Sequence, residues 1–156
     1  MSKDNPYHIS IGAVVVNEKN EICCHHFDKI EIGGTLFEDI HILMRETIEP
    51  NESIEQCLER GLKEEFGMKA ELVSYLGSIT SLLDLKDLAR VEKTTLYFLC
   101  KPINFDYEKR KKDDPESSSS IKWIKADELI QLMKKQADKY QRDDADESKI
   151  IMRIKF

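Results

Sequence analysis

One stretch with strong helical periodicity, residues 53–67, constrains the fold of this chain more than any other feature. Ser53 stands at an N-cap position and Gln56 follows three residues later, which is the spacing of a capping box. Apolar residues then recur every three or four positions and predict one buried face, made of Ile54, Cys57, Leu58, Leu62 and Phe66. Gly67 is expected to end the helix. The segment therefore predicts an amphipathic helix that covers one side of a core.

Segments rich in β-branched and aromatic residues occur before and after this helix. Strands are expected at 8–16 and 22–27, joined as a hairpin, and at 39–44, 71–80, 93–103 and 121–124. Residues 81–92 are interpreted as a loop or a short helical turn, 126–140 as a second amphipathic helix, and the remainder up to Phe156 as helical. Strands interleaved with two helices predict an α/β fold in which a mixed sheet packs between helices.

Length and charge limit the classes of function. A chain of 156 residues with 40% apolar composition is long enough for one domain, expected at 1–156. The formal net charge of -6 argues against a broad nucleic-acid-binding surface. No apolar run reaches the roughly 18 residues of a membrane span, and the N-terminus lacks the pattern of a signal peptide. A cytoplasmic protein without a membrane partner is therefore expected.

The four cysteines, Cys23, Cys24, Cys57 and Cys100, lie in apolar segments. This placement favours buried, reduced thiols over a disulfide framework. The run "CCHH" at 23–26 raises the alternative of a zinc site. Neighbouring residues on a strand point to opposite faces, and no second Cys or His pair follows at finger spacing, so the zinc interpretation is disfavoured.

Acidic residues near the end of the first helix form a candidate metal site. On an α-helix, positions 61, 64 and 65 share a face, so Glu64 and Glu65 would present two carboxylates there. Carboxylate oxygens suit hard cations such as Mg²⁺. Arg60 is expected to pair with Glu64 or with Glu52. Composition alone favours a solvated acidic face instead, and Gly61 brings no ligand to the site.

The spacing of this whole stretch resembles the signature of the Nudix hydrolase family, G-x5-E-x7-R-E-U-x-E-E-x-G-U, where U is a bulky apolar residue. The matching positions are Glu52, Arg60, Leu62, Glu64, Glu65, Gly67 and Met68. Two positions depart, because Glu46 stands at the first glycine and Gly61 at the first helix glutamate. The segments 9–16, 47–53, 67–79, 93–99 and 121–129 are also similar to the family, so the resemblance covers most of the chain.

The resemblance implies an α/β/α sandwich and Mg²⁺- or Mn²⁺-dependent hydrolysis of a diphosphate linkage in a small nucleotide-type substrate, a nucleoside triphosphate or a dinucleoside polyphosphate. It implies a catalytic set in which Glu64 and Glu65 are metal ligands and Arg60 pairs with Glu52 to hold the loop against the helix. The family's ligand at position 61 is missing. One hypothesis is an exchange, in which Glu46 supplies a metal-binding carboxylate instead. The alternative is a degenerate site with weak or no metal binding.

Three further residues are candidates for the site. Glu116, before the strand at 121–124, is a candidate acidic ligand, and Arg45 and Lys93 are weak candidates for binding substrate phosphates, because such residues are mostly on the surface. The first hypothesis for function is a Nudix pyrophosphohydrolase. The second is a catalytically impaired Nudix-fold module that binds a nucleotide or a protein partner.

Overall fold

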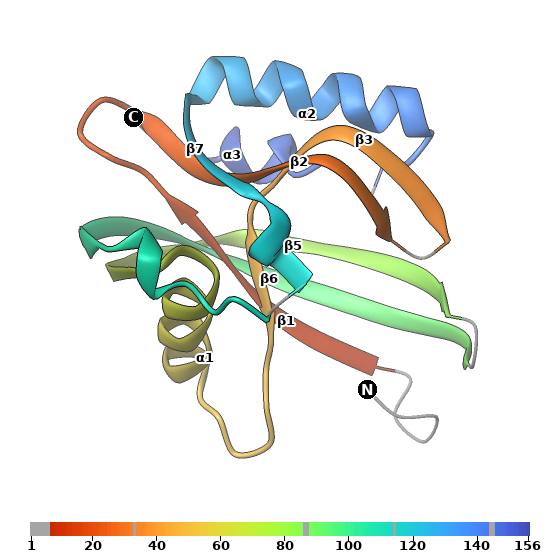
Figure 1. Ribbon diagram of the computed structural model, residues 1–156, viewed down its shortest axis with the longest axis horizontal. Helices are drawn as coiled ribbons and strands as arrows, with labels where there is room; N and C mark the ends of the chain where they lie inside the picture. The colour runs from red at the N-terminus through yellow and green to blue at the C-terminus, as the bar shows by residue number, and fades with distance from the viewer. Residues whose placement is uncertain (1–6, 33, 86–87, 114, 144–145) are drawn as a thin grey trace.

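The computed structural model describes residues 7–32, 34–85, 88–113, 115–143 and 146–156, and in these residues two sheets pack between helices (Figure 1). The four-stranded sheet has the order β4-β1-β6-β5 and comprises β1 (Tyr7–Val15), β4 (Met44–Thr47), β5 (Met68–Leu85) and β6 (Leu88–Phe105). The three-stranded sheet has the order β3-β2-β7 and comprises β2 (Glu21–Ile32), β3 (Thr35–Ile42) and β7 (Ser120–Lys125). Strands β1 and β6 are parallel and the other described pairs are antiparallel. The four-stranded sheet is therefore mixed.

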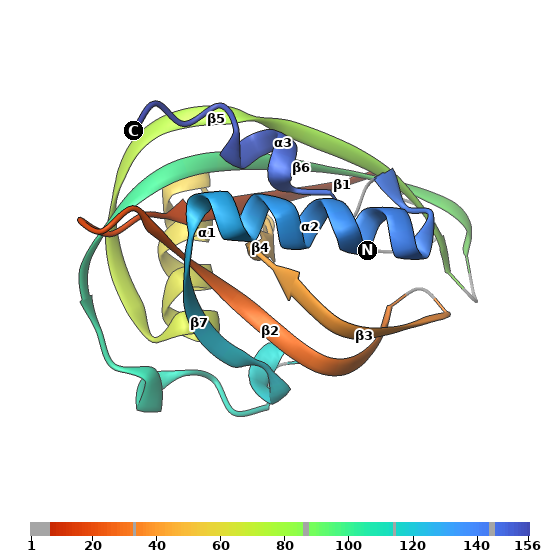
Figure 2. The same cartoon turned by 90° about the horizontal axis from the view of Figure 1, so that it is seen from above.

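Helices cover the strands from two sides. The helix α1 (Ile54–Gly61) continues into a π-helical turn, η1 (Leu62–Phe66), on one side, and α2 (Ala126–Tyr140) and α3 (Ser148–Ile151) lie on the other (Figure 1). Seen from above, α2 crosses over the strands and α1 lies behind them (Figure 2). Two short 3₁₀ helices, η2 (Tyr107–Lys109) and η3 (Pro115–Ser118), lead into β7. The expected α/β fold with a mixed sheet between helices is confirmed.

The first strand is buried on both faces from Ser10 to Val15, and this part is apolar except for Ser10. Ile11 and Ala13 pack against α1 and η1, whereas Val14 faces α2 and α3. This alternation follows from the period of two along a strand. A continuous apolar run is typical of a strand buried on both faces. The four cysteines are buried free thiols, in agreement with the expectation from their apolar surroundings.

Two expectations about strand connections are wrong. The strands β1 and β2 do not form a hairpin, because they belong to different sheets and only a single bridge between Val16 and Ile22 joins them. Residues 81–92 are neither a loop nor a helical turn. Their described residues continue β5 and β6 as one long antiparallel hairpin, in which Ser81 pairs with Lys93. Residues 86 and 87 lie outside the described residues.

The chain crosses from one sheet to the other where a single strand was expected at 39–44. The strand β3 ends at Ile42 and β4 begins at Met44 in the other sheet, so Leu43 is the crossing residue. Among the described residues after α2, the α-helix expected up to Phe156 is limited to α3 at Ser148–Ile151, whose Ile150 and Ile151 are buried in one cluster with residues of α2. Among the residues that the structure describes, no helix is long and apolar enough to cross a membrane.

Candidate functional site

The helix α1 begins with the capping box that its sequence predicts. The Ser53 hydroxyl accepts a hydrogen bond from the Gln56 N–H at 3.1 Å, and the Gln56 side chain accepts one from the Ser53 N–H at 2.9 Å. The segment before it is also closed locally, because the Glu49 N–H donates to Oε2 of Glu52 at 2.9 Å. These bonds set the direction in which α1 leaves the β4–α1 segment, and hence the position of Arg60, the last residue but one of α1.

Arg60 joins the helix to this preceding segment. Its Nε donates to Oε1 of Glu52 at 2.7 Å and its Nη2 donates to Oε2 at 3.0 Å, so the pair is bidentate. Nη2 also donates to the carbonyl oxygen of Thr47 at 2.9 Å. The hydrogen bonds from Arg60 lower the pKa of the Glu52 carboxyl to about 2. The structure therefore contains the brace between Glu52 and Arg60 that the sequence predicts.

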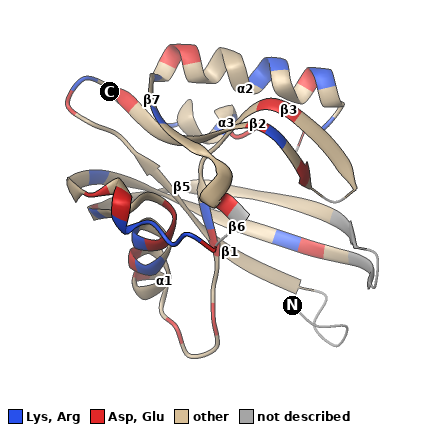
Figure 3. Cartoon of the chain, viewed as in Figure 1, with Lys and Arg blue, Asp and Glu red and all other residues tan. Residues whose placement is uncertain are grey.

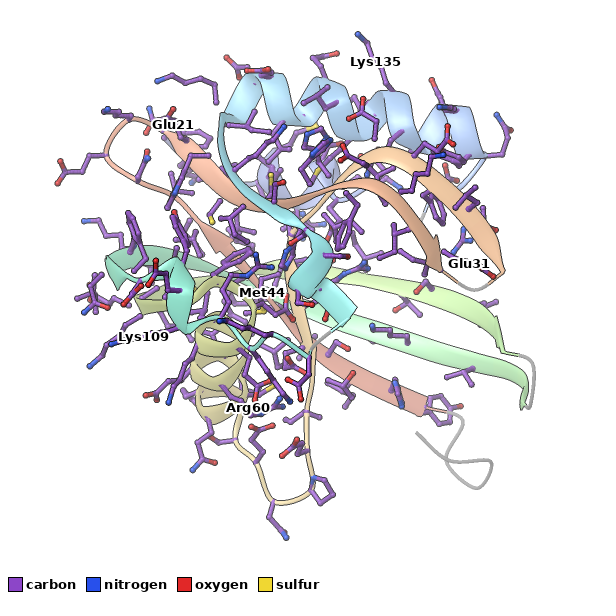
Figure 4. The ribbon with its side chains drawn as sticks, in the orientation of Figure 1. Glu21, Glu31, Met44, Arg60, Lys109 and Lys135 are labelled. Carbon is purple, nitrogen blue, oxygen red and sulfur yellow. The ribbon has the colours of Figure 1, made fainter. Side chains whose placement is uncertain are left out.

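The remaining nitrogen of this guanidinium lies among three more carboxylates. Nη1 of Arg60 is 3.2 Å from Glu46, 3.6 Å from Glu64 and 3.9 Å from Glu49. We call Arg60, Glu46, Glu49, Glu52 and Glu64 the Arg60 cluster. Figure 4 shows Arg60 between α1 and the segment that leads into it, where acidic and basic positions lie close together (Figure 3). Two of the three predicted metal ligands, Glu46 and Glu64, thus share one guanidinium nitrogen.

Gly61 and Glu46, the two residues that depart from the signature, lie in contact. A Cβ built on Gly61 would lie 2.8 Å from Cβ of Glu46 and 2.9 Å from Sδ of Met44. Real Cβ contacts are not this short. The space that a glutamate at position 61 would need is therefore already filled by Glu46 and Met44.

The end of the helix differs from the expected α-helical face. The five residues of η1 form a π-helical turn, which Gly67 closes in the left-handed conformation, with φ of 60°. The Gly67 N–H bonds to the carbonyl oxygens of Leu62 and Lys63. In this turn Glu64 faces Arg60 with 26% of its side chain exposed, whereas Glu65 is 2% exposed and faces the interior. The side chains of Glu64 and Glu65 thus have different partners, and the π-helical turn departs from the α-helical i, i+3, i+4 register.

Glu65 is held by a buried histidine. Nε2 of His25 lies 2.8 Å from Oε2 of Glu65, and Nδ1 lies 2.6 Å from Oγ of Ser119. Burial, followed by the nearby charges of Arg110 and Arg45, lowers the pKa of His25 to about 3. The ring is therefore neutral. Because a carboxylate only accepts, Nε2 carries the proton and donates it to Glu65, and Nδ1 accepts from the Ser119 hydroxyl.

Arg110 completes this row of hydrogen bonds. Its Nη2 donates to Oγ of Ser119 at 2.9 Å, and its Nε donates to the carbonyl oxygen of Glu65 at 2.6 Å. Nη2 also donates to the carbonyl oxygen of Glu116 at 2.8 Å. The sequence interpretation missed His25, Ser119 and Arg110 as parts of the site. Only the paired histidines of "CCHH" gave a signal, and that signal was considered for zinc.

An inter-sheet cleft of about 230 Å³ opens beside Glu65. Residues of both sheets line it, and the polar ones include four predicted positions: Glu65, Glu116, Arg45 and Lys93. The predicted residues thus fall into two groups. Glu46, Glu52, Glu64 and Arg60 lie in the Arg60 cluster, and the other four line the inter-sheet cleft.

The donor chemistry fits a hard divalent cation, since Glu46, Glu64, Glu65 and Glu116 offer only oxygen. The positions of these four carboxylates fit a metal ion less well than their chemistry does. No three His, Cys, Asp or Glu residues are arranged to hold a metal ion in the part of the chain that the structure describes. Glu46 and Glu64 instead face Arg60, whose single positive charge they share with Glu49 and Glu52. A metal bound here would share these two carboxylates with Nη1 of Arg60.

Three solved structures illustrate the proteins whose fold is similar to that of this chain. A NUDIX hydrolase from Nitrosomonas europaea is 17% identical with a TM-score of 0.61, over 80% of this chain and 76% of that one. The MutT protein from Methanosarcina mazei Go1 is 18% identical with a TM-score of 0.59, over 92% of this chain and 94% of that one. A UDP-X diphosphatase is 17% identical with a TM-score of 0.55, over 86% of this chain and 64% of that one.

No curated protein matches the chain. A family model does match it, in agreement with the similar structures. The model of the NUDIX domain matches residues 6–144, which include both sheets, the capped helix, the Arg60 cluster and the inter-sheet cleft. The resemblance stated from the signature is thereby confirmed, and the chain belongs to the NUDIX domain family.

Proposed function

We propose that this Nudix hydrolase is a metal-dependent pyrophosphohydrolase that cleaves a diphosphate linkage in a nucleotide-type substrate. The observation that carries the proposal is the inter-sheet cleft, where the His25-bound carboxylate of Glu65 and the cations Arg45 and Lys93 line the same space. A diphosphate needs both a metal-binding carboxylate and cationic partners for its oxygens. The cleft offers both.

In this proposal Glu64, Glu65 and Glu46 hold Mg²⁺ or Mn²⁺. The bound cation would neutralise phosphate oxygens and lower the pKa of a water molecule, which makes that water a better nucleophile. His25 fixes the direction of the Glu65 carboxylate through its 2.8 Å hydrogen bond. Arg60 and Glu52 keep the β4–α1 segment, which follows Glu46 directly after Thr47, against the helix.

The substrate class is part of the same proposal. The titles of similar structures name a MutT protein and a UDP-X diphosphatase. At 17–18% identity these likenesses support the fold rather than a substrate. We propose nucleoside triphosphates and dinucleoside polyphosphates as the first compounds to test, followed by nucleotides in which the diphosphate links to another group.

A second function is favoured by one observation. Glu46 and Glu64 lie 3.2 Å and 3.6 Å from Nη1 of Arg60, and Gly61 contributes no ligand. A chain with this arrangement that takes up no metal would be a catalytically impaired module that binds a nucleotide or a protein partner.

Two measurements decide between these functions. The first is calorimetric titration of Mg²⁺ and Mn²⁺ into the wild-type protein and into a variant with Glu64→Gln and Glu65→Gln. The second is a chromatographic screen for hydrolysis of the compounds above with either ion. The pyrophosphohydrolase requires metal uptake and product formation by the wild type, and loss of both in the variant. Wild-type protein that takes up neither ion at millimolar concentration and forms no product is the binding module instead.

A further inference from the structure

The loop before β7, described at residues 106–113 and 115–119, is fastened to the end of the helix that carries the proposed metal ligands (Figure 1). The Lys111 N–H of this loop donates to the carbonyl oxygen of Glu64 at 2.8 Å. Carbonyl groups in the last turn of a helix have no partner within the helix. The loop before β7 therefore supplies a partner that the π-helical turn η1 needs.

Arg110 makes the other contact between this loop and η1. Its Nε donates to the carbonyl oxygen of Glu65 at 2.6 Å, and its Nη2 donates to that of Glu116 at 2.8 Å. Nη1 and Nη2 also donate to the carbonyl oxygen and to Oγ of Ser119, at 3.1 Å and 2.9 Å. A guanidinium presents five N–H donors in one rigid plane, so a single side chain can hold several segments. Arg110 thus joins η1, η3 and the residue before β7.

Glu65 is connected to Arg110 by two routes. The direct route is the bond from Nε of Arg110 to the Glu65 carbonyl oxygen. The indirect route ends at the Glu65 carboxylate and runs from Nη2 of Arg110 through the Ser119 hydroxyl and the His25 ring. The two routes close a ring of hydrogen bonds that includes both the main chain and the side chain of Glu65. This ring fixes the direction of the carboxylate relative to its own main chain.

Every member of the indirect route gives its proton toward the carboxylate. Arg110 donates to Ser119, the Ser119 hydroxyl donates to Nδ1 of His25, and Nε2 of His25 donates to Glu65. Bonds that point in one direction polarise one another, so the loss of one donor weakens the next bond. Three of these side chains are buried, with Ser119 7%, Glu65 2% and His25 1% exposed, so water does not replace a lost partner.

We propose that Arg110 and Ser119 are positioning residues, which orient the Glu65 carboxylate through His25 and thereby raise the affinity of the protein for a divalent metal ion. The inference rests on the proposed function in taking Glu65 to be a metal ligand, and it adds two residues that do not touch the ion. A carboxylate whose direction is already fixed loses little side-chain freedom when the ion binds. Arg110 also holds the main chain at Glu116, which lines the same inter-sheet cleft.

The first test measures Mn²⁺ binding without substrate, by isothermal titration calorimetry. Ser119→Ala is expected to weaken binding about tenfold, since partners of a metal ligand contribute about 10–100-fold to affinity. Ser119→Thr keeps a hydroxyl and should bind within about threefold of the wild type. Arg110→Met and Arg110→Lys should both weaken binding about tenfold, because an ammonium group lacks the planar set of donors. Lys109→Met, a loss of charge at an exposed position of the same loop, is the matched control and should leave binding unchanged.

A double-mutant cycle separates positioning from general support of the fold. His25→Leu removes the link between Ser119 and Glu65. In its presence, Ser119→Ala should not weaken Mn²⁺ binding further, because residues that act in one row are not additive. Fold-changes that multiply would show that Ser119 acts by another route, and would overturn the inference. Circular dichroism of each variant identifies any that does not fold.

The ¹⁵N nuclear magnetic resonance spectrum of His25 in the metal-free protein is a second readout, which needs no His25 variant. The row requires a proton on Nε2 and a hydrogen bond from Ser119 to Nδ1. The Nδ1 resonance should therefore shift in Ser119→Ala and, through the weakened Ser119 hydroxyl, in Arg110→Met, but not in Lys109→Met. A proton on Nδ1 of the wild type, or an Nδ1 resonance that is unchanged in Ser119→Ala, would overturn the row.

The outcomes distinguish this inference from the proposed function. Mn²⁺ binding that depends on Ser119 and Arg110, in a protein that hydrolyses no nucleotide, would support the positioning role and overturn the pyrophosphohydrolase. Hydrolysis together with unchanged Mn²⁺ affinity in the folded Ser119→Ala and Arg110→Met variants would overturn the positioning role and leave the enzyme. Wild-type protein that takes up no Mn²⁺ would overturn both.

Discussion

Glu46 fills the space beside Gly61: a Cβ built on the glycine would lie 2.8 Å from Cβ of the glutamate. These are the two positions at which the chain departs from the Nudix signature. The departures are therefore in direct contact, and the small residue at one makes room for the larger residue at the other. This contact does not by itself make Glu46 a metal ligand, because the carboxylate of Glu46 lies 3.2 Å from Nη1 of Arg60.

This contact predicts strong coupling between the two positions. Gly61→Glu alone should lower the free energy of unfolding by about 1–3 kcal/mol, because it overpacks a filled site. Adding Glu46→Gly should recover most of that loss, since it removes the Cβ that clashes. A double-mutant cycle by chemical denaturation measures the coupling, which we expect to exceed about 1 kcal/mol.

Glu46→Ala provides the control for this cycle. It removes the carboxylate but keeps the Cβ, so Gly61→Glu should remain destabilising in its presence. Equal rescue by Glu46→Ala and Glu46→Gly would assign the coupling to charge rather than to space. For metal binding, the exchange hypothesis expects Glu46→Gly to weaken Mn²⁺ affinity and the double variant to restore it. If Glu46→Gly leaves that affinity unchanged, Glu46 is not a ligand.

The Arg60–Glu52 pair predicts a loss of stability in acid. The pKa of Glu52 is lowered to about 2, chiefly by hydrogen bonds from Arg60. A carboxyl with a lowered folded-state pKa stabilises the protein above its unfolded value near 4.5, and this contribution is lost as pH falls toward 2. In Glu52→Gln the free energy of unfolding should therefore depend less on pH between about 4.5 and 2. Thermal melts across this window measure the difference.

Arg60→Ala should destabilise the protein at neutral pH. The pair is partly buried, with Arg60 22% and Glu52 11% exposed, and Arg60 also bonds to the Thr47 carbonyl. We expect a loss of about 2 kcal/mol, between the values for exposed and fully buried pairs. Glu49→Ala is the control, because Glu49 is 65% exposed and 3.9 Å from Arg60, and it should cost less than about 0.5 kcal/mol. Equal losses of unfolding free energy in Arg60→Ala and Glu49→Ala would show that Arg60 stabilises the protein no more than an ordinary surface charge.

The fold was predictable where local sequence determines it. The capping box at Ser53, the apolar face of α1 and the whole of α2 follow from spacing within one segment. The separation of β1 and β2 into two sheets was not predictable in this way, because strand partners such as β1 and β6 are about 85 residues apart. A polar turn between two apolar runs favours a hairpin only when no distant strand pairs better.

In the site, too, contacts within one segment were predictable and contacts between distant segments were not. The bond between Glu52 and Arg60 joins residues within one motif and was predicted. His25, by contrast, bonds to Glu65 40 positions away and to Ser119 94 positions away, so no spacing in the sequence indicated this row. The π-turn also escaped prediction, since periodicity assumes α-helical geometry up to Gly67. The resemblance to a family supplied the roles of Glu64 and Glu65, but not their separate orientations.

Those orientations predict different outcomes for the two glutamates. Glu64→Ala should change the free energy of unfolding by less than about 0.5 kcal/mol, because its contact with Arg60 is 3.6 Å long, beyond hydrogen-bond distance, and partly exposed. Glu65→Ala should cost about 1–3 kcal/mol, because it leaves a buried N–H of His25 without its acceptor. Chemical denaturation measures both. A small loss for Glu65→Ala would mean that His25 does not depend on this carboxylate.

Lys93 makes the pH dependence of anion binding a further test. Its pKa is lowered to about 8 by burial first and by Arg45 second, so the side chain is mostly charged at pH 7 and mostly neutral at pH 9. A bound phosphoryl dianion favours the charged form, so binding above pH 8 must take up a proton. Affinity should then fall with rising pH, by at most about tenfold per unit. The probe is methyl phosphate, whose second pKa near 6 keeps it dianionic throughout.

The matched variant for this prediction is Lys93→Arg, because a guanidinium stays charged over the whole range. Calorimetric titrations from pH 7 to 9.5, in buffers of different ionisation enthalpy, give both the affinity and the protons taken up. We expect proton uptake near pH 8.5 by the wild type and none by Lys93→Arg, whose affinity should stay level. An equal fall in both proteins would show that another group titrates, and that Lys93 does not bind the anion through its charge.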